Sequence, residues 1–219
     1  FDGDRKADPV IYNESGGTWH VWLSAAGYAR FDTAGKGGLG RQAAAADFDG
    51  DRLADWAVMN EGLWTLWLSG AGYAPLGPVA CGTPASRPAP ADYDGDGFAD
   101  PAAFDAGLWT ARVSGAGYRS LGPRAFGAAG SCPAPADYDG DGFADPAVFE
   151  AGHWTAWLSG SGYRPLGSLS FGAAGNCPAP ADFDGDGFAD PAVFQSGPGT
   201  WAALLSSLGY GRVGPLRLR

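Results

Sequence analysis

The 219-residue sequence has little positive charge, little sulfur and little histidine. It contains 14 Lys and Arg against 24 Asp and Glu, with two His, three Cys and one Met, and its formal net charge is −10. Nucleic-acid affinity depends on basic contacts to phosphate, so this balance argues against a nucleic-acid partner. No apolar run approaches the ~18–20 residues of a membrane-spanning helix. We therefore expect no membrane span.

The cysteines are too few and too scattered to indicate a zinc site or a disulfide framework. Cys81, Cys132 and Cys177 are an odd number and include no CxxC pair. Cys132 and Cys177 are 45 residues apart. Free thiols are the favoured interpretation, and a single 132–177 bridge stays open on spacing alone.

Catalytic motifs are also missing. His20 and His153 lie at non-equivalent places, and there is no G-x-S-x-G motif or phosphate-binding loop. The paired carboxylates belong to the repeated motif described below. We predict that the protein is not an enzyme.

The dominant feature that is present is an internal repeat. The segment that begins at Asp47 recurs at Asp92, Asp137 and Asp182, with a period of 45 residues. Residues 1–46 form an earlier, more divergent copy. The sequence thus predicts a single repeat domain over residues 1–219, whose five copies are 1–46, 47–91, 92–136, 137–181 and 182–219.

The short apolar segments of each copy predict strands. PAVF, WTAWLS and RPLGSLSF are separated by Gly-containing turns, and none reaches the ~10–12 residues expected of a helix. Trp154 and Trp157 would point to opposite faces of one strand, so both faces are expected to be buried. Such a strand suits a blade packed between two others. We predict an all-β propeller with five blades of about 45 residues, in which PAPAD supplies a further inner strand and one blade lacks it.

Nineteen of the 24 acidic residues lie in the repeated motif D-x-D-G-D-x-x-x-D or its first, shorter copy. So many carboxylates in short loops repel one another unless a cation is present. A cage made only of oxygen ligands suits Ca²⁺. The predicted ligands are Asp47, Asp49, Asp51 and Asp55; Asp92, Asp94, Asp96 and Asp100; Asp137, Asp139, Asp141 and Asp145; and Asp182, Asp184, Asp186 and Asp190.

The seventh residue of each loop is expected to add its carbonyl oxygen while its side chain enters the core. These residues are Leu53, Phe98, Phe143 and Phe188. An EF-hand is excluded because the Glu at its position 12 is replaced, for example by Ala103 or Val148, and no flanking helices are readable. The sequence predicts four full Ca²⁺ sites. A fifth, at Asp2, Asp4 and Asp8, stays open because the first copy has no Asp at position 1.

The segment ADYDGDGFADPAVF and its equivalents, followed by the G-x-W-T strand and the FGAAG turn, resembles the VCBS and FG-GAP repeat family, whose repeats also occur in integrin α-chain heads. The resemblance covers essentially the whole chain. It implies a propeller with Ca²⁺ between the first two strands of each blade, in a secreted or cell-surface protein that is adhesive or sugar-binding. Family propellers commonly have seven blades, so closure of five blades as a monomer stays open.

Aromatic residues at equivalent places suggest where a ligand would bind. Trp19, Trp64, Trp109, Trp154 and Trp201 are expected in the core. A rim of Tyr and Arg residues is a candidate for binding glycans, namely Tyr28, Tyr73, Tyr118, Tyr163, Tyr210, Arg119 and Arg164. The predicted function is an extracellular, lectin-like binding or adhesion module for glycans or a cell-surface protein. The alternative is a purely structural, calcium-stabilised scaffold of a larger secreted protein.

Overall fold

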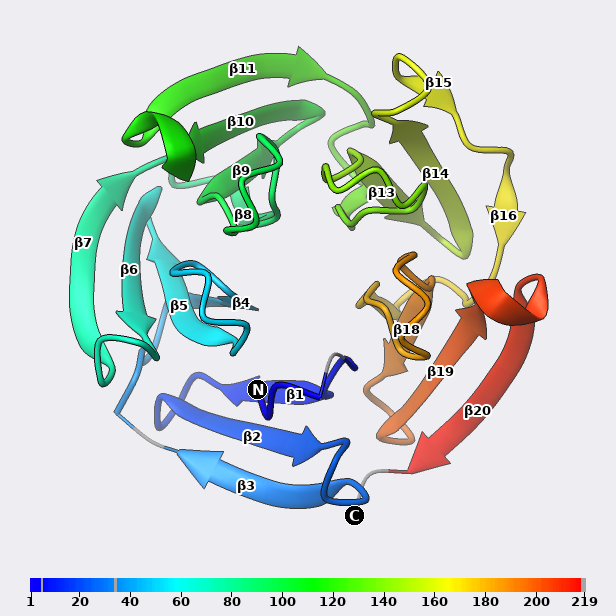
Figure 1. Cartoon of the computed structure of the whole chain (residues 1–219), viewed down its shortest axis with the longest axis horizontal. Helices are drawn as coiled ribbons and strands as arrows, with labels where there is room; N and C mark the ends of the chain where they lie inside the picture. Colours follow the sequence, from blue (N-terminus) through cyan, green and yellow to red (C-terminus); the bar gives the residue numbers. More distant parts are fainter. Residues whose placement is uncertain (5, 34, 218–219) are drawn as a thin grey trace. The chain divides into compact units, whose positions relative to one another are not determined.

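Five small antiparallel sheets account for nearly all of the regular structure (Figure 1). The structure is a computed structural model and describes residues 1–4, 6–33 and 35–217. The predicted fold class is confirmed, because the chain is all-β and its sheets are the blades of a five-bladed β-propeller. The described residues contain two short 3₁₀ helices, η1 (Ser114–Ala116) and η2 (Ser206–Leu208). No helix in these ranges is long and apolar enough to cross a membrane.

Contacts divide the chain into two compact units, each described by itself. Unit 1 comprises residues 1–4 and 8–126, and unit 2 comprises residues 5–7 and 127–219. The first sheet of unit 1 is β1 (Val10–Asn13), β2 (Thr18–Leu23) and β3 (Ala29–Thr33). The second is β4 (Gln42–Ala46), β5 (Asp55–Asn60), β6 (Leu63–Leu68) and β7 (Ala74–Ala80). The third is β8 (Arg87–Pro88), β9 (Ala102–Asp105), β10 (Leu108–Val113) and β11 (Arg119–Ala125).

Unit 2 holds the other two sheets. One consists of β12 (Cys132–Pro133), β13 (Ala147–Glu150), β14 (His153–Leu158), β15 (Arg164–Pro165) and β16 (Leu169–Ser170). Both β15 and β16 pair with β14, so together they take the place of one outer strand. The other sheet consists of β17 (Cys177–Pro178), β18 (Ala192–Gln195), β19 (Thr200–Leu205) and β20 (Gly211–Arg217).

In the sheets that begin with β4, β8, β12 and β17, the first strand comes from the segment before the Asp-rich loop, as predicted. In three sheets it is only two residues long and ends at a proline, Pro88, Pro133 or Pro178. Because proline cannot donate to a ladder, it is tolerated at such an edge. The sheet of the first copy has three strands among the described residues, which agrees with the expectation that one blade lacks its inner strand.

The core lies on the faces of the central strands. Trp19, Trp64, Trp109 and Trp154 are buried, as predicted, whereas Trp201 is half-buried. Alternation along a strand sends the second Trp of the WTAW pattern to the other face, where Trp157 is half-buried. Trp64 also donates a hydrogen bond from Nε1 to the Cys81 carbonyl at 3.0 Å, so its polar atom is satisfied inside the core. None of the three cysteines forms a disulfide, so there is no 132–177 bridge.

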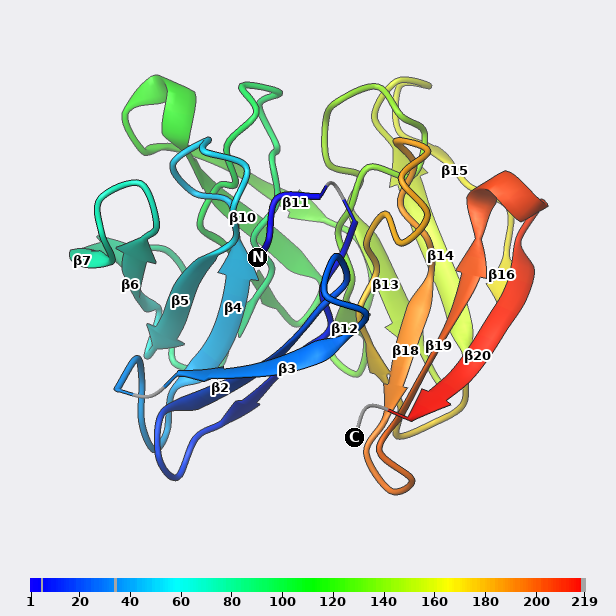
Figure 2. The ribbon, with the colours of Figure 1, turned by 60° about the horizontal axis from the view of Figure 1, so that its bottom comes forward.

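Two connections meet at the same end of each sheet that has an inner strand before its Asp-rich loop. The Asp-rich loop joins the first strand to the second, and a turn that begins with Ser joins the third to the fourth. Figure 2 shows this for the second sheet, where the loop after β4 and the turn between β6 and β7 lie at one end. The two are tied together, because Ser69 N donates to Asp55 Oδ1 at 2.6 Å. The sheet therefore presents its acidic loop on a fixed base.

Candidate metal centre

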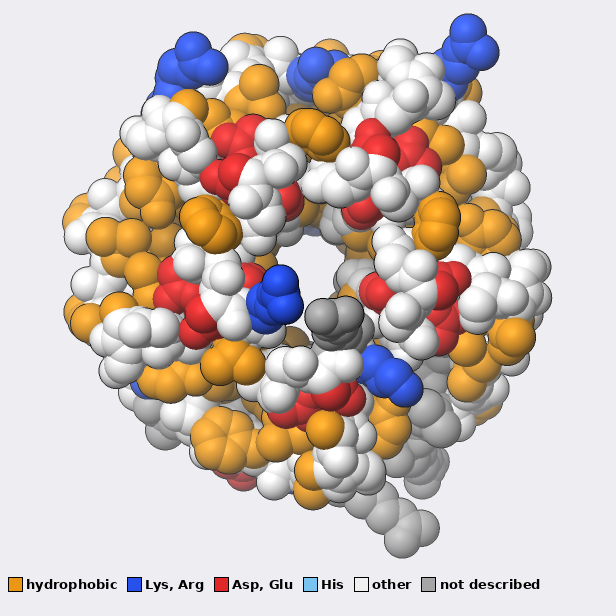
Figure 3. All heavy atoms as spheres, viewed as in Figure 1, with side chains coloured by type: hydrophobic (Ala, Val, Ile, Leu, Met, Phe, Trp, Pro, Cys, Tyr) orange, Lys and Arg blue, Asp and Glu red, His pale blue; other side chains and the backbone are white. Residues whose placement is uncertain are grey.

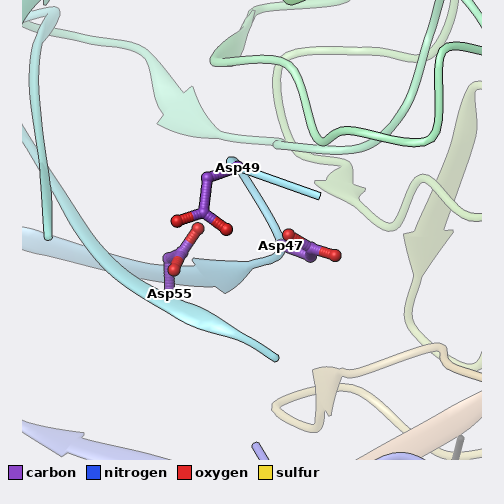
Figure 4. Close-up of side chains that lie close together, drawn as sticks. All are labelled: Asp47, Asp49 and Asp55. Atoms are coloured by element: carbon purple, nitrogen blue, oxygen red, sulfur yellow. The ribbon is translucent and has the colours of Figure 1, made fainter. Parts of the chain in front are cut away.

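The predicted loop carboxylates come together in four groups of three. In each group, one oxygen per residue lies within 4.8 Å of the others. Figure 4 shows the second copy, where Asp49 and Asp55 face each other with Asp47 beside them. The groups are Asp47, Asp49 and Asp55; Asp92, Asp94 and Asp96; Asp137, Asp139 and Asp145; and Asp182, Asp184 and Asp190. Each group could hold a metal ion, and Figure 3 shows the acidic side chains gathered in separate small clusters.

The first Asp of each complete loop organises the backbone. In the fourth copy, Asp137 Oδ1 accepts from Gly140 N at 2.6 Å and Oδ2 accepts from Gly142 N at 2.9 Å. The same pair of bonds is made by Asp47, Asp92 and Asp182. The fourth residue of each loop is glycine with a positive φ, for example +75° at Gly140, which lets the chain curl around the carboxylate. This curl directs the later carboxylates toward one point.

The Asp at position 9 of each complete loop is an internal anchor as well as a candidate ligand. Asp145 is fully buried, accepting from Tyr138 N at 2.8 Å and from Ser159 N at 2.7 Å. Asp55, Asp100 and Asp190 are buried in the same way and make the equivalent bonds. Both oxygens are thus fixed before any ion arrives.

Sequence reasoning missed the serine that opens the turn between the third and fourth strands. Ser69 Oγ donates to Asp51 Oδ2 at 2.7 Å, and Ser159 Oγ donates to Asp141 Oδ2 at 2.9 Å. Ser24, Ser114 and Ser206 make the equivalent bond. The Asp at position 5 of the loop therefore accepts a hydrogen bond from a serine hydroxyl. The signal was present, since a Ser recurs after each third strand, but serine is common in turns and does not by itself point to a carboxylate.

One atom of the fourth copy tests whether these residues fit a cation. Asp139 Oδ2 accepts from Gly160 N at 3.2 Å, but Oδ1 is buried and has no hydrogen-bond partner. Buried polar atoms are nearly always paired, so an orphaned carboxylate oxygen beside two other carboxylates requires an explanation. A bound cation would supply the missing partner. The grouped donors are carboxylate oxygens, which suit a hard cation.

Burial raises the pKa of several loop carboxyl groups in the absence of a metal ion. The pKa of Asp100 and that of Asp145 are each raised to about 6 by burial, although the hydrogen bonds from Ser114 N and Ser159 N oppose the shift. Burial also raises the pKa of Asp55, Asp92 and Asp190, and of Asp139, where Asp141 adds to the effect. A nearby cation would favour the ionised forms.

Successive loops contact each other within each unit. In unit 1, Ala99 N donates to the Asp47 carbonyl at 2.6 Å, and the ring of Phe98 lies where a Cβ on Gly50 would be. In unit 2, Ala189 N donates to the Asp137 carbonyl at 2.7 Å, and Phe188 lies against Gly140. A further bond in unit 2 joins Ala7 N to the Asp182 carbonyl at 3.1 Å.

These contacts correct the expectation that the seventh residue of the loop sends its side chain into the core. Phe98, Phe143 and Phe188 are 38%, 42% and 41% exposed. For Phe98 and Phe188, the reason is that the ring covers the glycine of the preceding loop. The carbonyl ligands predicted at these positions and at Leu53 stay predictions.

The first copy differs from the complete loops. Among the described residues, Asp2, Asp4 and Asp8 are not brought together as a metal-binding group. Asp8 keeps the anchoring role, because its Oδ1 accepts from Ser24 N at 2.6 Å. Asp2 Oδ2 accepts from Ala25 N at 3.0 Å. The loop retains the scaffold of the site.

The Tyr residues predicted to form a ligand rim lie close to the Asp loops. Each has a positive φ of 61–63° and ends the turn after the third strand. Tyr73 N donates to the Leu68 carbonyl at 2.7 Å, and the equivalent bond recurs at Tyr28, Tyr118, Tyr163 and Tyr210. Burial raises the pKa of the Tyr118 phenol, and the negative charge of Asp100 adds a smaller increase. Arg119 and Arg164 are exposed at the start of β11 and β15.

Comparison with known proteins gives similar structures but no family. No family model matches the sequence, and no curated protein matches it. The structure is similar to part of the Photorhabdus luminescens Tc holotoxin pore carrying TccC3-D651A, with a TM-score of 0.48 and 17% identity over 90% of this chain. It is also similar to dihydro-heme d1 dehydrogenase NirN in complex with DHE, with a TM-score of 0.46 and 14% identity over 99% of this chain. This chain spans 12% and 45% of their lengths.

Proposed function

We propose that the protein is a calcium-stabilised β-propeller of the VCBS and FG-GAP type that acts as a carbohydrate-binding module of a secreted or cell-surface protein. The observation that carries the calcium assignment is the recurrence of the three-Asp group in four copies, with a buried, unpartnered oxygen on Asp139. Ca²⁺ accepts six to eight oxygen ligands in flexible geometry, whereas Mg²⁺ loses its water reluctantly. The loop carboxylates would hold the ion, which would neutralise their charge when bound.

Calcium would act on stability and leave the remaining surface free for a partner. The candidate ligands are fixed by Ser hydroxyls and backbone N–H groups from two connections of one sheet. An ion that binds only the folded state adds about 2.7 kcal/mol per site at a hundredfold excess over Kd. A cation surrounded by these carboxylates would have few coordination positions open to a substrate. This supports a binding role rather than an enzymatic one.

A purely structural scaffold is the second candidate. It is favoured by the position of the predicted Tyr residues beside the metal loops, where Tyr118, Tyr163 and Tyr210 are only half-exposed. These rings would then serve the packing of the turn. Binding of a carbohydrate ligand would distinguish the carbohydrate-binding module from the scaffold.

The experiment is a thermal melt of the intact chain with and without EDTA, followed by Ca²⁺ titration and a glycan array on the loaded form. We expect a large fall in Tm on chelation, four or five bound ions, and a glycan signal. Restoration of Tm by Mg²⁺ at the same concentration would contradict the calcium assignment. No shift with EDTA would contradict the metal sites, and a blank array would favour the scaffold.

A further inference from the structure

A cavity lies beside β10 in unit 1, at a position where the repeat pattern is broken. Its volume is about 330 Å³, within the range of small-molecule sites. It is lined by the segment after β7, the last residue of β9, and residues of β10 and β11. The polar side chains that the argument uses are Thr83, Asp105, Arg112 and Ser120, and the apolar ones are Leu108 and Pro123.

The cavity coincides with a change of residue on one face of the third strand. Leu108, Thr110 and Arg112 alternate with buried Trp109, Ala111 and Val113, so the first three share a face. At the position of Arg112, the first, second and fourth copies have a tryptophan, namely Trp22, Trp67 and Trp157. The third copy thus replaces a bulky ring with a flexible, charged side chain.

The fifth copy also lacks the tryptophan at this position, and it also has a cavity. There the tryptophan is replaced by Leu204, and a second cavity, of about 460 Å³, is lined by Leu204 together with Phe171, Gly172 and Arg212. Phe171 and Gly172 are the equivalents of Cys81 and Gly82, which line the first cavity. The two cavities therefore overlap at these positions of the repeat. They differ in chemistry, because no carboxylate lines the second.

The two charged groups of the first cavity are available to a ligand. Arg112 Nε donates to the Ala80 carbonyl at 2.8 Å, which fixes the guanidinium and leaves its terminal N–H groups for other acceptors. Asp105 Oδ2 accepts from Thr83 Oγ1 at 2.8 Å. Within residues 1–4, 6–33 and 35–217, no carboxylate lies within 4.0 Å of the Arg112 guanidinium nitrogens. The cavity thus holds a donor and an acceptor of opposite charge that do not neutralise each other directly.

We propose that this cavity binds a neutral pyranose sugar, an inference that rests on the proposed carbohydrate-binding function and names its site. A sugar hydroxyl donates to a carboxylate and accepts from a guanidinium, so Asp105 and Arg112 can serve one ring together. Leu108, which is 49% exposed, and Pro123 offer apolar contact to its C–H groups. The charges of Asp105 and Arg112 sum to zero over the cavity, so a neutral ring leaves them balanced, whereas a carboxylate on the ligand would be repelled by Asp105.

The test is titration of the calcium-loaded chain with methyl glycosides of glucose, galactose, mannose and N-acetylglucosamine, followed by NMR. Arg112→Trp restores the residue of the neighbouring copies and fills the cavity, while Asp105→Asn removes the charged acceptor. We expect each to weaken binding of the best glycoside by about tenfold or more. Arg124→Ala is the matched control, because Arg124 is exposed on β11 and does not line the cavity.

The outcomes separate the site from the function. A glycoside that binds wild type and both cavity variants equally would overturn the cavity and leave the binding module standing. If no glycoside binds the wild type, both the cavity and the carbohydrate-binding function are wrong. Tighter binding of glucuronate than of the neutral glycosides would contradict the choice of a neutral sugar. If Arg112→Trp does not fold, as judged by its melt, Asp105→Asn decides the result.

Discussion

The Asp loops and the cavity beside β10 follow opposite rules. The complete loops repeat the same carboxylates, glycines and serine bond in four copies, whereas the cavity appears where one copy departs from the repeat. Residues that recur in every copy serve the stability of each blade, because every blade has to solve the same packing problem. A residue that departs from the repeat does not serve this shared packing requirement. We therefore propose that the loops serve stability and that the cavity serves ligand selection.

The largest expected effect separates two carboxylates of one loop. Asp145→Ala leaves the N–H groups of Tyr138 and Ser159 without acceptors, so we expect a loss of about 3 kcal/mol or more even in EDTA. Asp139→Ala removes one oxygen that has no partner and one that accepts a single long bond, from Gly160 N at 3.2 Å, so its cost in EDTA should stay below about 1 kcal/mol. With Ca²⁺, Asp139→Ala should lose one bound ion. Denaturant unfolding with and without EDTA, and ion counting, measure both. Equal costs in EDTA would contradict the distinction between anchor and ligand.

The next effect concerns contact between successive loops. Gly140 and Gly185 occupy the same loop position with φ of +75° and +85°, but a Cβ on Gly140 would meet the Phe188 ring at 2.8 Å, while one on Gly185 would meet nothing within 4 Å. Gly185→Ala should therefore cost only the backbone strain of about 1–2 kcal/mol. Gly140→Ala should cost at least about 1 kcal/mol more, because the ring has to move. Thermal melts of the two variants in Ca²⁺ compare them, and equal values would mean that the ring contact has no energetic role.

A smaller effect is a reversal of pH dependence by calcium. In the metal-free protein, the pKa of Asp100 and of Asp145 lies at about 6, above the value of about 4 for an unfolded chain. The stability that this shift gives is complete below the unfolded value and is lost as the pH rises through about 6. With Ca²⁺, ionised carboxylates are required, so stability should rise over the same interval. Melts in EDTA and in Ca²⁺ across this range test the reversal, and slopes of the same sign would contradict it.

The smallest expected effect lies at the cavity. Leu108→Gln changes a half-exposed side chain at the beginning of β10, and its cost should stay within about 0.5 kcal/mol with or without Ca²⁺. Denaturant unfolding checks this. A cost as large as that of Asp145→Ala would mean that the cavity and the loops share one role, and the comparison would fail.

The sequence predicted the features that depend on local spacing. The 45-residue period, the strands and the Asp groups follow from residues within a few positions of one another, such as Asp47, Asp49 and Asp55. The serine bond escaped prediction because Ser69 is 18 residues from Asp51 and meets it only when the sheet has formed. The exposure of Phe98 was not predicted, because its ring packs over Gly50 of the preceding copy and this contact exists only in the folded chain. The cavity could be predicted only by knowing which face of β10 carries Arg112.

The bond between successive loops has a consequence for the order in which the chain is made. Asp47 O receives its hydrogen bond from Ala99 N, so the loop of the second copy is completed only after the third copy has been synthesised. The same delay of one copy applies to Asp137 and Ala189. Asp182 instead receives its bond from Ala7, which lies four copies earlier in the chain. The loop of the fifth copy therefore waits for no later residue, but its partner is distant in the sequence, and contacts of that kind form slowly.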